Sequence, residues 1–216
     1  MKYILIAVAL IALAMCEPEH PRWPTKFSME FDEKFTYGPL SDETHGTFYY
    51  DAASGRYKVE RDNGRYDRYC GWNGIKIIDP TPCTHYVDEE GDRYLYYPTR
   101  KECCYCCSAE HGCGILRQNW QQGAAFEGEI EFNGYPAYKW DKKGLQSNLY
   151  IETIAENPDD RIMLNIDQKP NDSQTFDPDT YETDFPDKKL EKPSICQKSH
   201  KCSLLSVCTG VRHGFS

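Results

Sequence analysis

The sequence predicts a mainly β protein, a curved antiparallel sheet or half-barrel of about eight or nine strands with one short helix. Short runs of alternating apolar and polar residues recur at hairpin spacing, which is the strongest indication of such a sheet. The chain has 216 residues and 11 cysteines, which suggests disulfide bonding. Aromatic residues make up 13% of it, so we expect an aromatic core. These patterns do not distinguish an open sheet from a closed barrel or a sandwich.

The first 16 residues are predicted to be a secretory signal peptide. Lys2 precedes an apolar run over residues 3–15, which is shorter than the about 20 apolar residues of a bilayer span. Small residues place the cleavage after Ala14 or after Cys16. We therefore expect a signal peptide at residues 1–16, a β-rich domain at 17–195 and a Cys-rich tail at 196–216. The protein would be secreted, in the extracellular space or the endolysosomal lumen, without a transmembrane segment.

The acidic net charge of the chain argues against a nucleic-acid partner. The chain has 25 basic and 34 acidic residues and a formal net charge of −9. Binding to nucleic acid requires clustered Lys and Arg that neutralise phosphates, and no basic stripe is present in the sequence. We expect no nucleic-acid partner.

The cysteines are expected to form disulfides. Without Cys16 their number is ten, an even number as a closed set requires. They are Cys70, Cys83, Cys103, Cys104, Cys106, Cys107, Cys113, Cys196, Cys202 and Cys208. Neighbouring cysteines rarely bond each other, so we expect those of the 103–107 cluster to reach Cys70, Cys83 or the tail. The alternative is a zinc site, because the cluster contains two Cys-x2-Cys spacings and His111 is nearby. Secretion favours disulfides.

Strands are predicted along the first hundred residues. Alternation at Phe27, Met29 and Phe31 indicates the first strand. Residues 46–51 and 56–61 flank a small-residue turn that ends at Gly55, which predicts a hairpin. A short strand is predicted over 66–72, and a further hairpin over 84–87 and 93–97.

The second half is predicted to begin with the helix. Apolar residues at 115, 116, 120 and 124 have near-helical spacing, so we expect a short helix or helical turn that ends near Gly123. Residues 126–132 alternate cleanly, which would put Phe126, Ile130 and Phe132 on one face. Asn133-Gly134 predicts a hairpin into 135–140, and strands follow at 149–154 and 161–166. Residues 168–194 are predicted to be an extended strap with an N-glycosylation sequon at Asn171.

The motifs do not indicate catalysis or a resident cofactor. A Gly-x-Ser-x-Gly nucleophile elbow is missing from the sequence, and a free catalytic thiol would leave an odd number of cysteines for disulfides. A secreted hydrolase centred on His111 is the least favoured alternative. Asp-rich loops at 88–92, 159–160 and 177–179 do not match an EF-hand, so solvated turns are favoured over weak calcium binding.

Aromatic side chains are the candidate ligand-binding residues. Several lie on or beside predicted strands, where they could form the core or line a pocket for a lipid or a sugar. The candidates are Tyr50, Tyr57, Tyr94, Tyr96, Trp120, Tyr138 and Trp140.

The order of certain motifs resembles ependymin-related secreted proteins over residues 23–195. The motifs are Trp23-Pro-x-x-Phe27, Gly46-Thr-Phe-Tyr-Tyr-Asp51 followed by Arg56, Ile115-Leu-x-x-x-Trp120, Ala125-Phe-x-Gly128 and Gly134-x5-Trp140. The resemblance implies a fold similar to the half-barrel of bacterial lipoprotein carriers, in which a curved sheet partly encloses a hydrophobic ligand. Calcium binding is a property of some members. The cysteine cluster at 103–107 and the cysteines of the tail depart from the pattern.

Together these observations predict a secreted, non-catalytic protein that holds a lipid or other amphipathic ligand on a concave sheet. The alternative is a structural or interaction protein of an extracellular matrix, cell coat or secretory granule, which the acidity and the disulfide density favour. A homodimer is left open.

Overall fold

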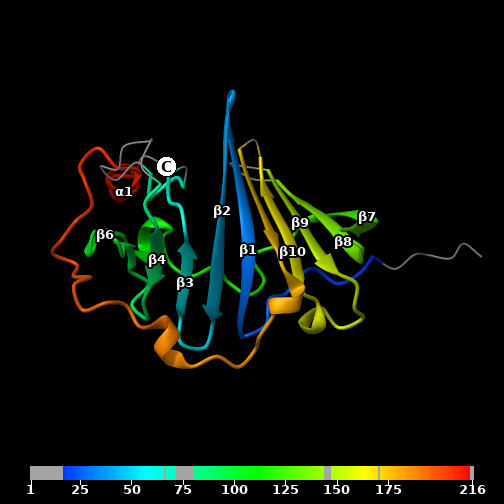
Figure 1. Cartoon of the computed structure of the whole chain (residues 1–216). Coiled ribbons are helices and arrows are strands. Elements are labelled where there is room, and N and C mark those ends of the chain that lie inside the picture. Colours follow the sequence, from blue (N-terminus) through cyan, green and yellow to red (C-terminus); the bar gives the residue numbers. More distant parts are fainter. Residues whose placement is uncertain (1–16, 66, 72–79, 144–146, 170, 215–216) are drawn as a thin grey trace, which may run out of the picture.

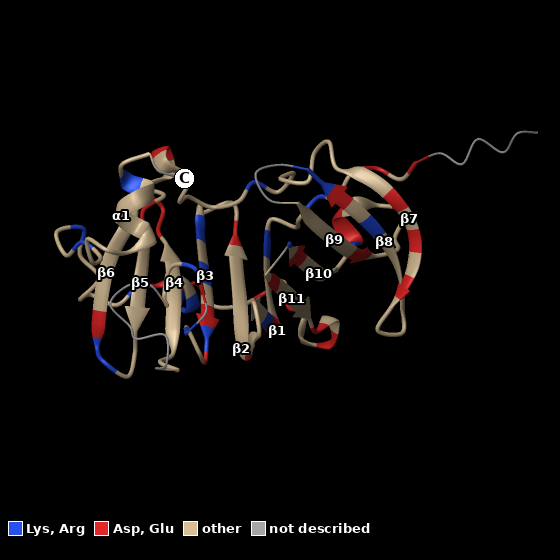
Figure 2. Cartoon of the chain, turned by 90° about the horizontal axis from the view of Figure 1, so that it is seen from above, with Lys and Arg blue, Asp and Glu red and all other residues tan. Residues whose placement is uncertain are grey.

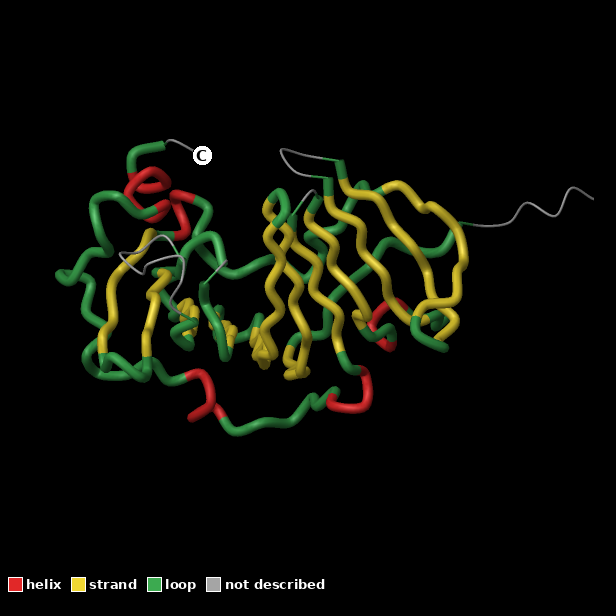
Figure 3. Tube along the Cα trace, turned by 45° about the horizontal axis from the view of Figure 1, so that its top comes forward, coloured by secondary structure: helices red, strands yellow, loops and turns green. Residues whose placement is uncertain are grey.

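In the computed structural model, the eleven strands among the described residues form one antiparallel sheet. The structure describes residues 17–65, 67–71, 80–143, 147–169 and 171–214, so the predicted signal peptide lies outside the described residues. The strand order is β6-β5-β4-β3-β2-β1-β11-β10-β9-β8-β7 (Figure 1). The sheet is curved and does not close, because β6 and β7 remain as its two edges (Figure 3). Among the described residues, no helix has the length and hydrophobicity needed to cross a bilayer.

The strands and helices have the following bounds. The strands are β1 (Lys26–Tyr37), β2 (Leu40–Asp51), β3 (Arg56–Arg61), β4 (Cys83–Val87), β5 (Arg93–Tyr97), β6 (Glu102–Cys107), β7 (Ala125–Phe132), β8 (Tyr135–Lys142), β9 (Asn148–Thr153), β10 (Met163–Gln168) and β11 (Asp172–Phe176). The 3-10 turns are η1 (Ala109–His111), η2 (Pro158–Asp160), η3 (Pro178–Thr180) and η4 (Asp187–Leu190), and the α-helix is α1 (Val207–Arg212).

The chain builds the sheet as two meanders that meet at its centre. Strands β1 to β6 follow one another outward from the centre to one edge. A crossover of residues 108–124 then leads to β7 at the opposite edge, and β7 to β11 return to the centre. There β11 pairs with β1, with Phe176 opposite Phe31.

The face of the sheet that carries Phe27, Phe48 and Tyr57, here called the inner face, is the concave one. One aromatic cluster on this face joins strands as far apart as β3 and β8. A second, Cys-rich cluster lies towards β6. Trp23 lies at the centre of the aromatic cluster, with its ring edge-on to four other aromatic rings. Its Nε1 donates a hydrogen bond to the Tyr150 hydroxyl at 3.0 Å. The opposite, outer face has three smaller clusters.

Residues 177–195 of the strap and the first cysteine of the tail pack against the outer face over part of the β2–β6 half. Phe185 and Leu190 of the strap pack against Tyr49 of β2. Further along, Cys196 joins Tyr86, Tyr94 and Tyr105 in a second outer cluster. The strap runs past the ends of the strands before the chain reaches α1 (Figure 1).

Strand β7 contains a β-bulge, which changes the face on which its side chains lie. The pairing of β7 with β8 shifts between Phe126 and Gly128, and Gly128 has a φ of 117°. Phe126 therefore packs on the inner face against Trp140, with 5.1 Å between ring centroids. Ile130 and Phe132 belong to an outer cluster. The prediction of one face for all three was wrong, because an extra residue in a strand reverses the alternation beyond it.

Two further predictions about elements need correction. Residues 118–123 form consecutive turns that end at Gly123, with hydrogen bonds such as Trp120 N–H to the Arg117 carbonyl, so the predicted helical turn is present, but the helix lies at α1. The described residues 67–71 form turns instead of a strand, because the Asp67 carboxylate accepts the backbone N–H groups of Tyr69 and Cys70. The strands β6 and β11 were not predicted, so the sheet has more than eight or nine strands. Their sequences, Cys-rich and polar respectively, lack a clear apolar alternation.

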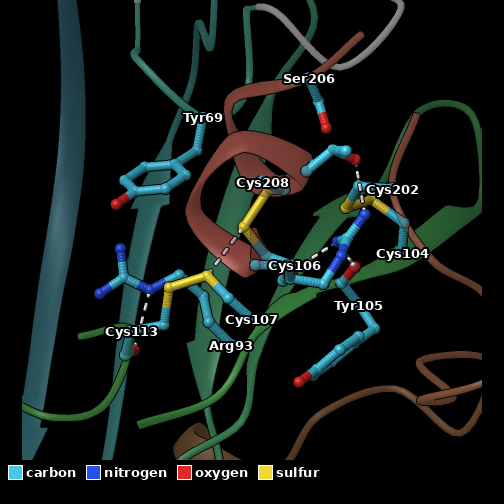
Figure 4. The surroundings of a disulfide bond; sticks show 12 residues. Tyr69, Arg93, Cys104, Tyr105, Cys106, Cys107, Cys113, Cys202, Ser206 and Cys208 are labelled. Carbon is cyan, nitrogen blue, oxygen red and sulfur yellow. Dashed lines mark hydrogen bonds between the residues drawn. A yellow bond between two sulfur atoms is a disulfide. The ribbon is translucent and has the colours of Figure 1, made fainter. Parts of the chain in front are cut away.

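All ten described cysteines form disulfides, which confirms that prediction. Strand alternation places Cys103 on the outer face, where it bonds Cys196, and Cys104 on the inner face, where it bonds Cys202. Cys106 bonds Cys208 of α1 (Figure 4). The other two bonds, Cys70–Cys83 and Cys107–Cys113, are local. Cys70 and Cys83 are therefore not partners of the cluster, although three of its members do reach the tail.

The three disulfides between β6 and the tail should stabilise the protein non-additively. Each closes a loop of more than 90 residues, with separations of 93, 98 and 102. When its neighbours are intact, removing Cys104–Cys202 by Cys→Ala substitution frees only a short loop, which we expect to cost about 2–3 kcal/mol. With both neighbours already removed, the same change should cost about 4–5 kcal/mol. Urea unfolding of the wild type and of the three variants (without Cys104–Cys202, without both neighbours, and without all three) measures both free energies, and equal costs would contradict this prediction.

Candidate functional site

A cavity of about 450 Å³ opens on the inner face between β1, β2, β3, β11 and the crossover. This volume is within the range of about 300–1,000 Å³ that is common for small-molecule sites. One wall is mostly apolar and the other is polar and charged. The apolar wall consists of Phe35, Phe48, Tyr50, Tyr57, Val59 and Leu116. The polar wall consists of Arg61, Asp67, Arg68, Tyr69, His85, Arg93, Gln168, Asn171, Asp172 and Gln174.

The apolar wall is built by cross-strand pairs of β2 and β3. Tyr50 lies opposite Tyr57, and Phe48 lies opposite Val59. The ring of Phe48 stacks on that of Tyr57 at 5.9 Å between centroids. The Tyr50 hydroxyl donates to the Leu116 carbonyl at 2.8 Å, which attaches the crossover to this wall. Leu116 itself is 45% exposed at the rim. The wall is therefore preformed, with one apolar side chain available for further burial.

The polar wall is centred on a buried ion pair between Arg61 of β3 and Glu33 of β1. Arg61 is 7% exposed and Glu33 is 1% exposed. Arg61 donates from Nε to one Glu33 oxygen and from Nη2 to the other, the second at 3.0 Å. Gln174 donates to the same carboxylate at 2.6 Å. The guanidinium lies over the Phe31 ring, which has room because Gly46 has no side chain at this position. The pair is thus buried and bidentate, and Arg61 also lines the cavity.

Asp67 and His85 form a second pair beside Arg61. The His85 Nε2 and the Asp67 Oδ1 are 2.9 Å apart. Burial opposes ionisation of Asp67, but the contact with His85 and the charge of Arg61 together hold the pKa of Asp67 well below its usual range. Burial lowers the pKa of His85, and this outweighs the opposite effect of Asp67. At neutral pH the pair therefore consists of a carboxylate and a neutral imidazole.

Asp172 of β11 lies against Glu33 on the same wall. Burial raises the pKa of Asp172 to about 8, and the neighbouring charge of Glu33 adds to this effect. Burial and the charge of Glu33 thus both favour the neutral form of this carboxyl group. Within the described ranges, the buried Asp172 Oδ1 and Arg61 Nη1 have no hydrogen-bond partner.

Arg93 lies at the other end of the polar wall, where it is fixed by two aromatic rings. Its guanidinium is 4.9 Å from the Tyr69 ring centroid and 5.6 Å from that of Tyr57. Its Nε donates to the Cys113 carbonyl at 3.1 Å, so the crossover holds it in place (Figure 4). Arg68 is exposed at the same wall.

The structure brings two of the seven predicted ligand-binding residues to this cavity, namely Tyr50 and Tyr57. Trp120, Tyr138 and Trp140 are also part of the inner aromatic cluster, but they pack away from the cavity. Tyr94 and Tyr96 belong to the outer cluster beside Cys196.

Sequence reasoning missed the charged wall. Its residues are spread from Glu33 to Gln174, and no local motif connects them. One signal was present in the sequence. Glu33 continues the alternation of Phe27, Met29 and Phe31 on the inner face, and Arg61 continues that of Tyr57 and Val59. A charged residue in an apolar stripe indicates a buried polar site.

The residues weighed for other chemistry lie elsewhere. Cys106 and Cys107 are in disulfides, and His111 is exposed in η1, where its Nδ1 is 2.9 Å from the Ser108 Oγ. In the acidic loop at 88–92, Asp88 and Asp92 form ion pairs with Lys192 and Lys198 of the strap and tail. The predicted glycosylation residue, Asn171, is exposed at the rim of the cavity.

The chain was compared with known proteins. No protein-family model matches it, and no curated protein sequence matches it. Solved structures with a partly similar arrangement include an uncharacterized conserved protein from Thermus thermophilus, with a TM-score of 0.49, 10% identity, and coverage of 81% of this chain and 89% of that one. The Pseudomonas aeruginosa MucA/MucB complex has a TM-score of 0.43, 10% identity, and coverage of 80% and 57%. A LolA superfamily protein from Nitrosomonas europaea has a TM-score of 0.37, 10% identity, and coverage of 79% and 92%.

Because the pKa of Asp172 is raised, the folded protein should become less stable as the pH rises. Between about pH 4 and pH 8 the folded protein retains the Asp172 proton and the unfolded chain loses it, so unfolding releases a proton. Relative to Asp172→Asn, the wild-type free energy of unfolding should fall by up to about 1.4 kcal/mol per pH unit in this interval and stay level above it.

Urea unfolding at several pH values measures this difference. Asp172→Asn keeps the sequon formed by Asn171 and Ser173, so glycosylation is matched. The exposed Asp184→Asn is the control for a carboxylate lost outside the cavity. Parallel curves for wild type and Asp172→Asn from pH 4 to pH 8 would contradict the prediction.

Proposed function

We propose that this is a non-catalytic binding protein that holds a lipid or another amphipathic small molecule in the inner-face cavity. The supporting observation is the division of the cavity into a wall of stacked aromatic rings and a wall of charged groups. A ligand with an apolar body and a polar end matches both walls. Small-molecule sites commonly combine an apolar lining with a few placed polar groups.

The rigidity of the apolar wall supports this function. Phe48, Tyr50 and Tyr57 are each at most 8% exposed and are held by neighbouring rings. A ligand would therefore bind without much ordering of side chains, which is one of the main costs of association. Each methylene group removed from water would contribute about 0.8 kcal/mol. Burial of the exposed part of Leu116 would add to this.

We further propose that the protein is secreted, with a signal peptide over residues 1–16, a glycan on Asn171, and an extracellular or endolysosomal destination. The five disulfides suit an oxidising compartment. A relationship to ependymin-related secreted proteins belongs to the same proposal and is supported by the motif order around Trp23, Trp120 and Trp140.

A structural or interaction role is the second candidate. It is favoured by the extent to which the inner face is already filled, since Trp140 is 0% exposed and Trp23 is 2% exposed. A protein of this kind would need no ligand in the remaining cavity. The two functions differ in whether a small amphipathic molecule binds.

The first test is native mass spectrometry of the protein from its own source, followed by lipid extraction. A reproducible added mass that is extracted as a lipid or another amphipathic molecule is the expected result. Absence of both an added mass and binding of a fluorescent fatty-acid probe would support the structural role instead.

A matched pair of variants tests the site of binding. Leu116→Asp places a charge on the cavity rim, and Leu40→Asp places one at the tip of the β1–β2 hairpin. The two leucines are 45% and 50% exposed, so the variants should fold equally well. We expect Leu116→Asp to weaken binding of the fatty-acid probe about tenfold, since roughly half of a leucine side chain's burial energy is lost. Leu40→Asp should bind as the wild type does. Equal affinity of both variants would contradict this site.

A further inference from the structure

We infer that the polar end of the ligand is a singly charged anion, a carboxylate, which binds between Arg61 and Arg93. This inference rests on the proposed function, because it places an amphipathic ligand in the inner-face cavity. It adds the chemical class of the head group and its orientation.

The balance of charge on the polar wall is the first argument. Arg61, Arg68 and Arg93 line the cavity, and the carboxylates of Glu33 and Asp67 face them. Two further groups of this wall are counted as uncharged near pH 7: Asp172, because burial raises its pKa to about 8, and His85, because burial lowers its pKa. Three guanidinium groups thus face two carboxylates. One negative charge on the ligand would balance the wall, whereas a cationic or uncharged head group would not.

The second argument is the buried guanidinium of Arg61. Its Nε and Nη2 are bonded to Glu33, but within the described part of the chain Nη1 is buried without an acceptor. A buried N–H that lacks a partner costs about 1–3 kcal/mol and usually signals a missing partner. Since Arg61 lines the cavity, an oxygen atom of the ligand can satisfy this donor.

The third argument is the state of Arg93. Its guanidinium is held over Tyr57 and Tyr69 and is attached to the crossover through Nε. Among the residues that the structure describes, no carboxylate forms an ion pair with Arg93, which distinguishes it from Arg61. A guanidinium that is fixed on aromatic rings offers a planar pair of donors that matches a carboxylate.

Arg61 and Arg93 lie near the same side chains, so both can bind one ligand group. The charges of both act on the same two residues, Tyr57 and His85, so both guanidinium groups lie near these side chains. Tyr57 also belongs to the apolar wall, where it stacks on Phe48. The head group would therefore lie beside Tyr57 and His85, with the apolar chain along Phe48 towards Leu116.

Probes with one chain and different head groups test this inference on the wild-type protein. Dodecanoic acid, 1-dodecanol, dodecyl phosphate and dodecyltrimethylammonium can be compared by calorimetry at two salt concentrations. We expect dodecanoic acid to bind at least tenfold more tightly than 1-dodecanol. The preference for the acid should persist at high salt, because a carboxylate bound between Arg61 and Arg93 would be buried, and buried charges are little screened.

A matched pair of variants then locates the head group. Arg93→Gln should weaken binding of dodecanoic acid about tenfold and leave binding of 1-dodecanol unchanged. Arg22→Gln, which removes a 57% exposed arginine side chain that does not line this cavity, should change neither. The comparison of probes on the wild type decides the inference even if Arg93→Gln folds poorly.

The outcomes separate the two proposals. Equal binding of the acid and the alcohol would overturn the anion site and leave the proposed function intact. Tighter binding of the phosphate or of the ammonium probe would also overturn the inferred carboxylate. If no probe binds, the proposed function fails together with the inference.

Discussion

The pairing of β11 with β1 is the interaction on which the rest of this structure depends. It joins two meanders, β1–β6 and β7–β11, into one sheet. Because β1 is the first strand and β11 the last, the chain must cross from one edge of the sheet to the other, and the crossover lies over the inner face. The same pairing brings Glu33 of β1 beside Gln174 of β11. The single sheet, the crossover over its inner face and the charged wall thus all depend on this one antiparallel pairing.

The groups of the charged wall stabilise one another, whereas burial of any one of these charges without its partners would cost free energy. Desolvation of an ion pair such as Glu33–Arg61 can exceed its Coulomb attraction, so such a pair is weak evidence for stability alone. Its carboxylate is satisfied by three donors, whereas Arg61 retains one donor without an acceptor among the described residues. A buried donor without a partner is rare in native proteins and calls for an explanation such as a bound water or another group. The contrasting pair, Glu152–Arg161, is buried in the core and bonded further to Trp140 and to backbone carbonyls.

The two edges of the sheet are protected in different ways. At β6 the tail pairs with the edge strand, since the Tyr105 N–H donates to the His200 carbonyl and the Cys202 N–H donates to the Tyr105 carbonyl. Three disulfides hold the tail in that position. At β7 the exposed residues include Glu127, Glu129 and Glu131, which form the acidic stripe in Figure 2. Like charges along an exposed edge disfavour pairing with a second chain. Some of the acidic residues of this protein thus protect an edge of the sheet.

By itself, the sequence determined most of the strands, the hairpin turns and the fact that all ten cysteines form disulfides, because these depend on local alternation, turn residues and an even number of cysteines. It also placed Tyr50 and Tyr57 among the candidate binding residues. Only the tertiary structure decided which cysteines pair, where the β7 bulge reverses Phe126 against Ile130, and that Glu33, Arg61 and Asp172 meet. These outcomes depend on strand order and register, both between neighbouring strands, as at the bulge in β7, and between distant segments, as for Glu33 and Gln174. Alternation within a strand assigns each side chain to a face, but it carries no information about which distant strand lies beside it.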